Sequence, residues 1–381
     1  MDILVSGAGM AGLSAAVNLG TRGHRVTIVE RSTHFRVNGS PIDIRGDALG
    51  IAERMGLLER IRDRRVDMTE QSQFIDGDGN VVVRVPVEEA GDSADDLEIA
   101  REDLARILAD ALPADARVLF QDSVDAIADD GDGVGVGVGV GVRFVSGRAE
   151  RYDLVIGADG LHSAVRRLVF GPERDFNHHL GYYAAIADMP GEEPRADRVN
   201  PIYNYPGHLA GIVRYNDTTL AIFMFRSDPI DYDHHDLDAQ KDILAEAFAG
   251  HTEWRIPDLL AAARADPELY FDSASQIRMP SWHRGRVVLV GDAAHAASGL
   301  SGRGTSLAFT GTHILAEELD RSGGDHLAAF ERYEERQRPY VDFAQHSVHG
   351  GADLIVPATW EAIRARNERV LASAGSRPAG A

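Results

Sequence analysis

The sequence predicts an α/β protein: a Rossmann-like domain, an antiparallel β-sheet domain inserted into it, and helices at the C-terminal end. Three observations lead to this prediction. A glycine-rich turn joins an apolar strand to an Ala/Leu-rich helix at the start of the chain. Two later apolar strands, at 154–157 and 287–290, also end in turns that contain Gly and Asp. Between them, residues 180–226 hold short strand-like runs separated by turn residues, which is typical of an antiparallel sheet.

The first βαβ unit carries the clearest motif. Residues 2–6 form an apolar strand, and residues 24–30 form a second strand that ends in Glu30. Gly7 permits a tight turn, Gly9 allows close approach of a pyrophosphate, and Gly12 lets the helix pack on the strand. Glu30 lies at the distance expected for an acid that binds ribose hydroxyls. The dinucleotide-binding residues predicted here are Gly7, Gly9, Met10, Ala11, Gly12, Glu30 and Arg31.

Composition limits the chemistry and the partners. The 381 residues allow two domains, and the chain has no cysteine, so redox chemistry would need a bound organic cofactor. The net charge of −21 disfavours nucleic acid and anionic membranes as partners. The chain has neither a membrane-length apolar run nor a signal peptide, so we expect a cytoplasmic monomer or homodimer. The pairs His178-His179 and His234-His235 lack metal-site spacing, so we expect no metal.

Changes of pattern along the chain predict the domain organisation. Helices are expected at 46–66, 101–112, 236–249, 256–265, 304–320, 325–346 and 357–373. The Rossmann-like domain is expected to comprise 1–67, 98–172 and 276–340, and the sheet domain 68–97 and 173–275. The C-terminal helices would occupy 341–373, with a disordered tail at 374–381. The alternating Gly/Val tract from Gly131 to Val142 is expected to form a hairpin.

Two further segments indicate which dinucleotide is bound. The strand at 154–157 leads into Ala158-Asp159-Gly160, and the strand at 287–290 leads into Gly291-Asp292. After the second strand, Gly302-Arg303-Gly304 opens a long helix. Asp292 suits a ribityl hydroxyl as acceptor, and the N–H groups of 302–304 suit a phosphate or flavin oxygen. These features favour FAD over NAD as the bound dinucleotide.

In order and spacing, the three segments resemble the motifs of the group A FAD-dependent monooxygenases. This para-hydroxybenzoate hydroxylase-like family includes aromatic polyketide hydroxylases and tetracycline-inactivating enzymes. The resemblance extends to Arg101 in Arg-Glu-Asp-Leu and to Asp43-Ile44-Arg45-Gly46, which it places near the flavin. Gly299 stands where many relatives have proline, and Thr305 where the usual residue is asparagine. The further cofactor candidates are Arg45, Arg101, Asp159, Gly160, Gly291, Asp292, Gly302, Gly304 and Thr305.

The resemblance implies a reaction cycle. NADPH or NADH, binding transiently, would reduce FAD, and O2 would form a flavin C4a-hydroperoxide that hydroxylates an aromatic or polyketide-like molecule. A Baeyer–Villiger or epoxidising monooxygenase and a flavin-dependent reductase of the same fold stay open as alternatives. So does a catalytically impaired flavoprotein that binds an aromatic ligand, because Gly299 next to the flavin would loosen the site.

The substrate is expected between the flavin and the inserted sheet. Along 220–226, Phe223 and Phe225 share one face, while Ile222, Met224 and Arg226 share the other. Only one set can face the pocket, and the sequence does not decide which. The pocket candidates are Tyr203, Tyr205, Arg214, Phe223, Phe225, Arg226 and Gly299. The sequence assigns no catalytic base, and His295 is expected to be structural.

Overall fold

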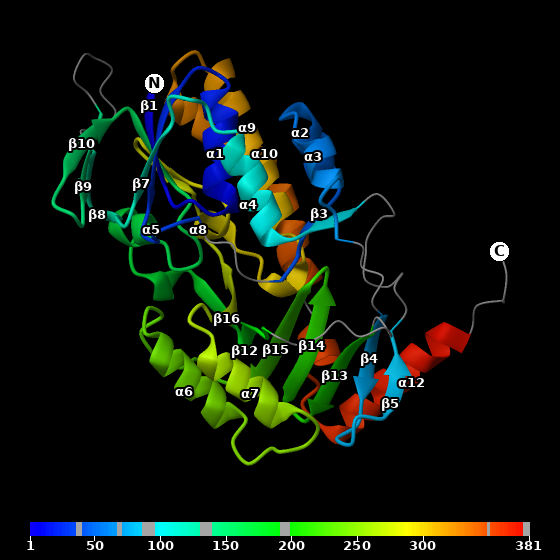
Figure 1. The fold of residues 1–381 in the computed structure, drawn as a ribbon. Coiled ribbons are helices and arrows are strands. Elements are labelled where there is room, and N and C mark those ends of the chain that lie inside the picture. The colour runs from blue at the N-terminus through cyan, green and yellow to red at the C-terminus, as the bar shows by residue number, and fades with distance from the viewer. Residues whose placement is uncertain are drawn as a thin grey trace.

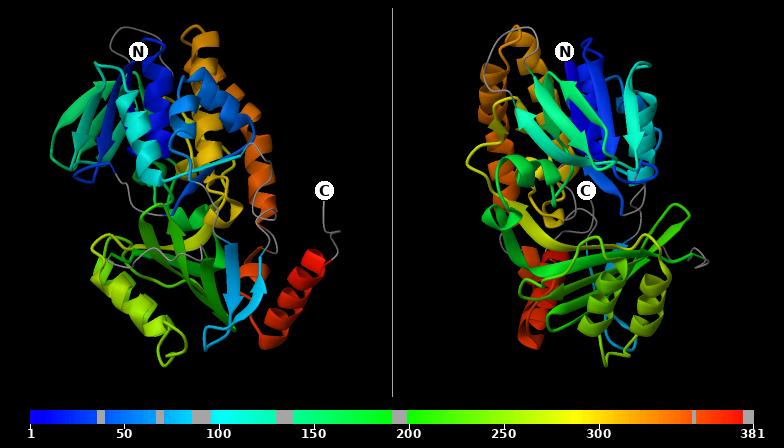
Figure 2. Two further views of the ribbon diagram at one scale, coloured as in Figure 1. Left: turned by 45° about the vertical axis from the view of Figure 1, so that its right-hand side comes forward. Right: turned by 90° about the vertical axis from the view of Figure 1, so that its left-hand side faces the viewer.

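The computed structural model describes residues 1–35, 40–66, 71–85, 96–129, 139–190, 199–348 and 351–375. It consists of two stacked bodies (Figure 1). The upper body holds a mainly parallel sheet with helices packed on it. The lower body is a second sheet, and the right-hand view of Figure 2 shows it as a layer between the upper body and two helices below. The α/β fold class predicted from the sequence is confirmed.

The upper sheet has six strands in the order β17-β18-β11-β1-β2-β7. Its strands are β1 (Asp2–Ser6), β2 (Arg25–Glu30), β7 (Arg117–Phe120), β11 (Leu154–Gly157), β17 (His283–Arg284) and β18 (Val287–Leu289). All pair in parallel except β17. The residues of β1 and β11 are almost wholly buried, as expected for central parallel strands covered on both faces.

Helices from distant parts of the chain complete the core of the upper body. The helix α1 (Met10–Gly20) packs against α9 (Gly304–Arg321) and α4 (Arg101–Asp110), and α10 (His326–Ser347) packs against α9. The other elements are α5 (Ala164–Val169), α8 (Asp292–His295), the hairpin β3 (Ile42–Ile44) with β6 (Leu97–Ile99), and the small sheet β8 (Val124–Asp129), β9 (Val140–Phe144) and β10 (Ala149–Tyr152). The helix expected at 46–66 is two helices, α2 (Asp47–Arg54) and α3 (Leu58–Arg62), because Gly56 between them has a φ of 71°.

The lower sheet has seven strands in the order β16-β12-β15-β14-β13-β4-β5. They are β4 (Gln71–Ile75), β5 (Val81–Arg84), β12 (Asn177–Asp188), β13 (Val199–Tyr205), β14 (His208–Tyr215), β15 (Thr218–Arg226) and β16 (Tyr270–Ile277). Helices α6 (Leu237–Ala247) and α7 (Ile256–Ala265) cover the face that points away from the upper body (Figure 2). This strand membership supports the expected domain boundaries, which stay a prediction.

The C-terminal part of the chain crosses from one body to the other. After α10 it forms α11 (Gly351–Ile355) and α12 (Trp360–Gly375), and α12 packs beside β5 and β13. Arg366 donates a hydrogen bond to Asn204 Oδ1 at 3.1 Å and lies 3.5 Å from the ring centroid of Phe74. Residues 376–381 of the expected tail and 131–138 of the Gly/Val tract lie outside the described residues.

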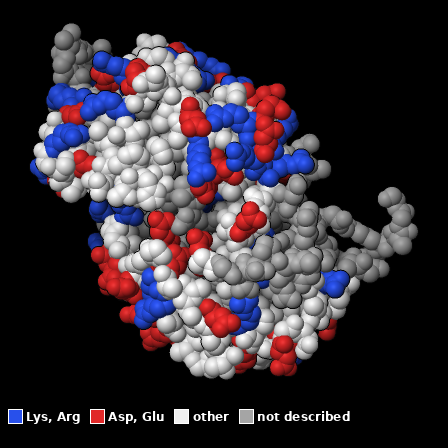
Figure 3. All heavy atoms as spheres, viewed as in Figure 1, with Lys and Arg blue, Asp and Glu red and all other residues white. Residues whose placement is uncertain are grey.

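Two surface properties bear on partners. Within the described ranges, no helix is both long and apolar enough to cross a membrane. On the face drawn in Figure 3, acidic side chains alternate with basic ones over the upper body, so this face presents no continuous basic patch.

Candidate functional site

The turn after β1 has the geometry that its glycines predict. Gly7 has a φ of +103°, and a Cβ there would lie 2.5 Å from the carbonyl oxygen of Ala158. At Gly12 a Cβ would lie 1.9 Å from the carbonyl oxygen of Gly7, so only glycine lets α1 begin this close to the turn. At Gly9 a Cβ would meet nothing within 4 Å. Gly7 and Gly12 are therefore required by the fold, whereas Gly9 leaves its space to a ligand.

Glu30 is held at the end of β2 by backbone groups. One carboxylate oxygen accepts a hydrogen bond from the N–H of Ala8 at 2.8 Å, and the other accepts one from Ser32 at 2.9 Å. The carboxylate is thereby oriented beside the glycine turn, and each oxygen keeps a further lone pair for a hydroxyl group. The next residue, Arg31, is exposed and contacts His235 of the lower body.

The segment after β11 uses its acid locally. The carboxylate of Asp159 accepts hydrogen bonds from Ser163 Oγ and, at 3.0 Å, from the N–H of Val165. Ser163 caps α5 by accepting the N–H of Arg166 at 2.9 Å. Gly160 adopts a φ of +80° between these groups. Asp159 therefore shapes the turn and the start of α5, and its contribution to cofactor binding stays a prediction.

The segment after β18 brings its acid to the same edge of the sheet. Gly291 has a φ of +58°, and a Cβ there would lie 2.7 Å from the Cβ of Ala11, so this turn lies against the first turn of α1. Asp292 is exposed, while Ala293 behind it is fully buried. The surrounding protein raises the pKa of the Asp292 carboxyl, and the charge of Arg101 partly opposes this rise.

A charged cluster lies beside the glycines that open α9. Arg45 forms an ion pair with Asp43 at 3.1 Å, and a Cβ at Gly302 would lie 3.2 Å from the Asp43 carboxylate. The N–H of Arg45 donates to Ser306 Oγ at 2.9 Å, which ties this loop to α9. Glu98 on β6 is the cross-strand partner of Asp43 on β3. Its burial, together with the charge of Asp43, raises the pKa of Glu98 to about 7.

The first turn of α9 is open to a ligand. Gly304 is exposed, and a Cβ there, as at Gly299, would meet nothing within 4 Å. Thr305 is buried, and no side chain, its own hydroxyl included, caps this helix start. The N–H groups at the N-terminus of an 18-residue helix therefore face open space, an arrangement that favours anions.

These segments fit an FAD molecule. Gly7 touches the turn after β11, Ala11 touches the turn after β18, and Gly302 touches the Arg45 loop. All lie where parallel strands end, the usual edge for dinucleotides in such sheets. Gly9, Gly299 and Gly304 lie in the segments at this edge and leave open the space that a Cβ would take. The predicted cofactor residues stay candidates.

The structure corrects the predicted substrate wall. Phe223 and Phe225 lie on the face of β15 that packs against α6 and α7, and both rings contact Phe248, with centroids 5.3 and 6.3 Å apart. Tyr203 and Tyr205 belong to the same buried cluster. These four aromatic residues therefore face away from the upper body, because α6 and α7 cover their side of the sheet.

Arg214 also belongs to the helix-covered face. It lies on the same face of β14 as Ala210 and Ile212, which pack under the helices. Its guanidinium donates to the carbonyl oxygen of Val199 at 3.1 Å. The opposite face of β15 carries Ile222, Met224 and Arg226, all partly exposed. Arg226 donates to the carbonyl oxygen of Val356 at 2.6 Å and to Asp353, so it anchors the segment after α11.

One polar group at the junction of the two bodies, the His162 ring, was not predicted from the sequence. His162 Nδ1 lies 3.0 Å from Glu173, and its Nε2 lies 3.2 Å from Asp272 on β16. Burial alone would lower the pKa of His162, but these hydrogen bonds raise it to about 9. Its ring stacks on His234 at 4.1 Å. The only signal in the sequence was its position two residues after Gly160, and its partner on β16 is 110 residues away.

The two histidine pairs set aside as metal ligands lie apart. Within the parts of the chain that the structure describes, only Asp233, His234 and His235 bring three possible ligand atoms within reach of one ion. Arg31 contacts His235, and its positive charge opposes a cation there. The expectation that no metal is bound stays a prediction.

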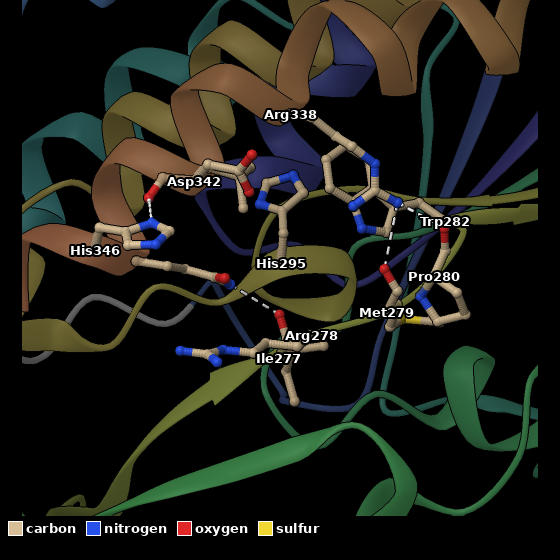
Figure 4. Close-up of a pocket in the computed structure, with 11 residues that line it drawn as sticks. Ile277, Arg278, Met279, Pro280, Trp282, His295, Arg338, Asp342 and His346 are labelled. Atoms are coloured by element: carbon tan, nitrogen blue, oxygen red, sulfur yellow. Dashed lines mark hydrogen bonds between the residues drawn. The ribbon is translucent and has the colours of Figure 1, made fainter.

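His295 faces a cavity that is separate from the glycine edge. The cavity has a volume of about 470 Å³ and lies between the end of β16 and α10 (Figure 4). In this view the His295 ring lies between Asp342 and Trp282, and its centroid is 4.7 Å from that of Trp282. Burial lowers the pKa of His295 to about 3, so it stays neutral. The geometry supports a packing role for His295.

Comparisons with known proteins agree with this geometry. A family model described as FAD binding domain matches residues 1–342. An uncharacterized protein of Mycobacterium tuberculosis is 40% identical over 362 residues, covering 92% of this chain and 95% of that protein. A flavin-dependent monooxygenase of Legionella longbeachae is 36% identical over 348 residues, covering 91% and 87%. The structure of tetracycline destructase Tet(51) matches with a TM-score of 0.83 at 32% identity, covering 98% of this chain and 96% of that one.

Proposed function

This chain belongs to the FAD binding domain family and, within it, to the FAD-dependent monooxygenases, and we propose that it hydroxylates an aromatic or polyketide-like small molecule. NADPH or NADH would supply two electrons. One oxygen atom of O2 would enter the substrate as a hydroxyl group, and the other would leave as water. FAD supplies this redox chemistry when bound, and the protein orients it and excludes water.

The observation that carries the proposal is the alignment of Gly9, Asp292 and Gly304 along one open edge of the parallel sheet. Gly9 and Gly304 offer backbone N–H groups to phosphates, and Asp292 offers an acceptor to a hydroxyl. Below this edge, Ile222 and Met224 present apolar side chains from the lower sheet. A flat, largely apolar substrate bound between this edge and the lower sheet would contact the cofactor. Relatives named as tetracycline destructases support polycyclic, oxygen-rich candidates.

The test is the rate of NADPH and NADH oxidation by the purified, FAD-loaded protein. It is measured with and without a panel of phenols, anthraquinones and tetracyclines. We expect one class to accelerate oxidation and to yield a product one oxygen atom heavier. A bound flavin that neither NADPH nor NADH reduces, with any compound present, would contradict the proposal and favour a ligand-binding flavoprotein. A cytoplasmic location and a monomeric or homodimeric state stay predictions from the sequence.

A further inference from the structure

Tyr182 lies on the face of the lower sheet that points to the upper body. Its cross-strand partner on β15 is Arg226, and its neighbour Tyr183 pairs with Phe225 on the helix-covered face. The register between β12 and β16 shifts just before it, between His179 and Tyr183, where Gly181 has a φ of +88°. Such a bulge re-aims the side chain that follows it, and bulges of this kind are frequent next to active sites.

Ser298 lies in the loop that joins the Asp292 turn to the start of α9. Its φ of 75° and ψ of 146° fall in a region that glycine adopts readily and other residues rarely do. The loop is anchored before this residue, because the carbonyl oxygen of Ala296 accepts hydrogen bonds from Ile277 and Gln345. It is also anchored after it, because Ser301 Oγ donates to the carbonyl oxygen of Ser298 at 2.8 Å. Strain therefore concentrates at Ser298.

The side chains of Tyr182 and Ser298 lie close together: the Ser298 hydroxyl opposes the rise of the Tyr182 pKa, and neither hydroxyl has a hydrogen bond of normal geometry among the described residues. Tyr182 is 1% exposed, and burial raises its pKa to about 12, so it keeps its proton and can donate. A buried hydroxyl without a partner is costly, and two that lie close together need only a small movement to pair.

We propose that Tyr182 is a positioning residue: by pairing with the Ser298 hydroxyl it sets the backbone of Gly299 against the bound flavin. Tyr182 belongs to the sheet that would bind substrate, and Gly299 is exposed in the loop between Asp292 and Gly304. This pairing would couple the sheet that we propose binds substrate to the proposed cofactor edge. This inference rests on the proposed function for the presence of FAD, but its first readouts need no substrate.

The experiment compares Tyr182→Phe, Ser298→Ala and the double variant with the FAD-loaded wild-type protein. We expect each single substitution to shift the flavin absorption spectrum and to weaken FAD binding about two- to tenfold, the loss typical of one hydrogen bond. The double variant should be no weaker than the stronger single variant, because both substitutions remove the same contact. With a substrate in hand, both should also release more H2O2 per NADPH consumed.

Tyr183→Phe is the matched control. It removes the same hydroxyl from the next residue of β12, but that hydroxyl accepts the N–H of Ile230 at 2.8 Å on the opposite face of the sheet. We expect it to lower the unfolding temperature and to leave the flavin spectrum unchanged. Ser298→Gly relieves the backbone strain, so it should raise stability and still reproduce the spectral shift of Tyr182→Phe.

The outcomes separate this inference from the proposed function. A wild-type protein that binds no FAD would overturn the proposed function. FAD binding with an unchanged spectrum and affinity in Tyr182→Phe, or additive losses in the double variant, would overturn the positioning role alone. If Tyr182→Phe does not fold, Ser298→Ala and Ser298→Gly carry the test, and unchanged flavin properties in both would also overturn it.

Discussion

His162 and Asp272 join the two bodies of the protein. Nε2 of His162, in the turn after β11, lies 3.2 Å from a carboxylate oxygen of Asp272 on β16. The other ring nitrogen lies 3.0 Å from Glu173, so a protonated ring satisfies two carboxylates at once. Because Asp272 also acts electrostatically on Asp292, this junction lies close to the proposed cofactor edge.

This junction predicts how stability depends on pH. The pKa of His162 is about 9 in the folded protein and about 6.5 when unfolded, so the folded state favours the protonated form. The stabilisation is fully present below pH 6.5 and is lost as the pH rises through 9. We expect a loss of about 2 kcal/mol in unfolding free energy over that range. Urea titrations of the wild-type protein and His162→Gln check it; equal slopes against pH would contradict it.

Arg166 predicts a large effect on stability. Its guanidinium is fully buried and donates to the carbonyl oxygens of Ala293 and Leu161 and to Glu173. Arg166→Met would remove the donor to the carbonyl oxygens of Ala293 and Leu161 and the cation beside Glu173, which costs about 3 kcal/mol. Arg167→Met, at the exposed neighbouring position, should stay within about 0.5 kcal/mol of the wild-type protein. Denaturant unfolding of both variants measures the difference, and similar losses would refute the assigned role.

The glycine turn predicts two different outcomes for the same substitution. Gly12→Ala places a methyl group 1.9 Å from the carbonyl oxygen of Gly7, so α1 must move and the protein should unfold at a markedly lower temperature. Gly9→Ala meets no protein atom within 4 Å, so the apoprotein should stay as stable as the wild type. Its methyl group would enter the proposed pyrophosphate space and weaken FAD binding at least about tenfold. Calorimetry of the apoproteins and FAD titration distinguish the two.

Removing the charge of Asp292 should stabilise the apoprotein and weaken FAD binding. Since the surrounding protein raises the pKa of its carboxyl, the charged form is less favoured in the folded apoprotein than in the unfolded chain. Asp292→Asn removes the charge with little change in shape, so the apoprotein should become slightly more stable while FAD binds more weakly. Arg101, which now favours that charge, would lose a partner, and this limits the gain. Unchanged FAD affinity would argue against Asp292 as a cofactor ligand.

The backbone turns of the proposed cofactor edge were predictable from the sequence because their geometry is local. Gly7 and Gly12 are required by contacts within one βαβ unit, and the turn at Gly291 follows directly from an apolar strand. Short spacings of this kind carry their own structural meaning. The break between α2 and α3 at Gly56 was local as well, but a single glycine inside a helical pattern is an ambiguous signal.

The substrate side was not predictable, because it depends on contacts distant in the sequence. Alternation along β15 separates Phe223 from Met224, but the choice of face depends on whether α6 and α7 cover one side. The ion pair of His162 with Asp272 spans 110 residues. The approach of Tyr182 to Ser298 depends on a bulge between β12 and β16 in the lower sheet. No periodicity within one segment reports such pairings.

The two faces of β15 therefore predict opposite consequences for neighbouring residues. Phe223→Ala empties a site packed against Phe248 and should cost about 3 to 5 kcal/mol of stability. Met224→Ala removes a partly exposed side chain from the face toward the cofactor edge, so it should cost at most about 1 kcal/mol. It should instead change the KM for substrate, or the substrate preference across the panel. Unfolding curves and kinetics of both variants test this. A Met224→Ala enzyme with unaltered KM for every substrate would show that this face does not line the pocket.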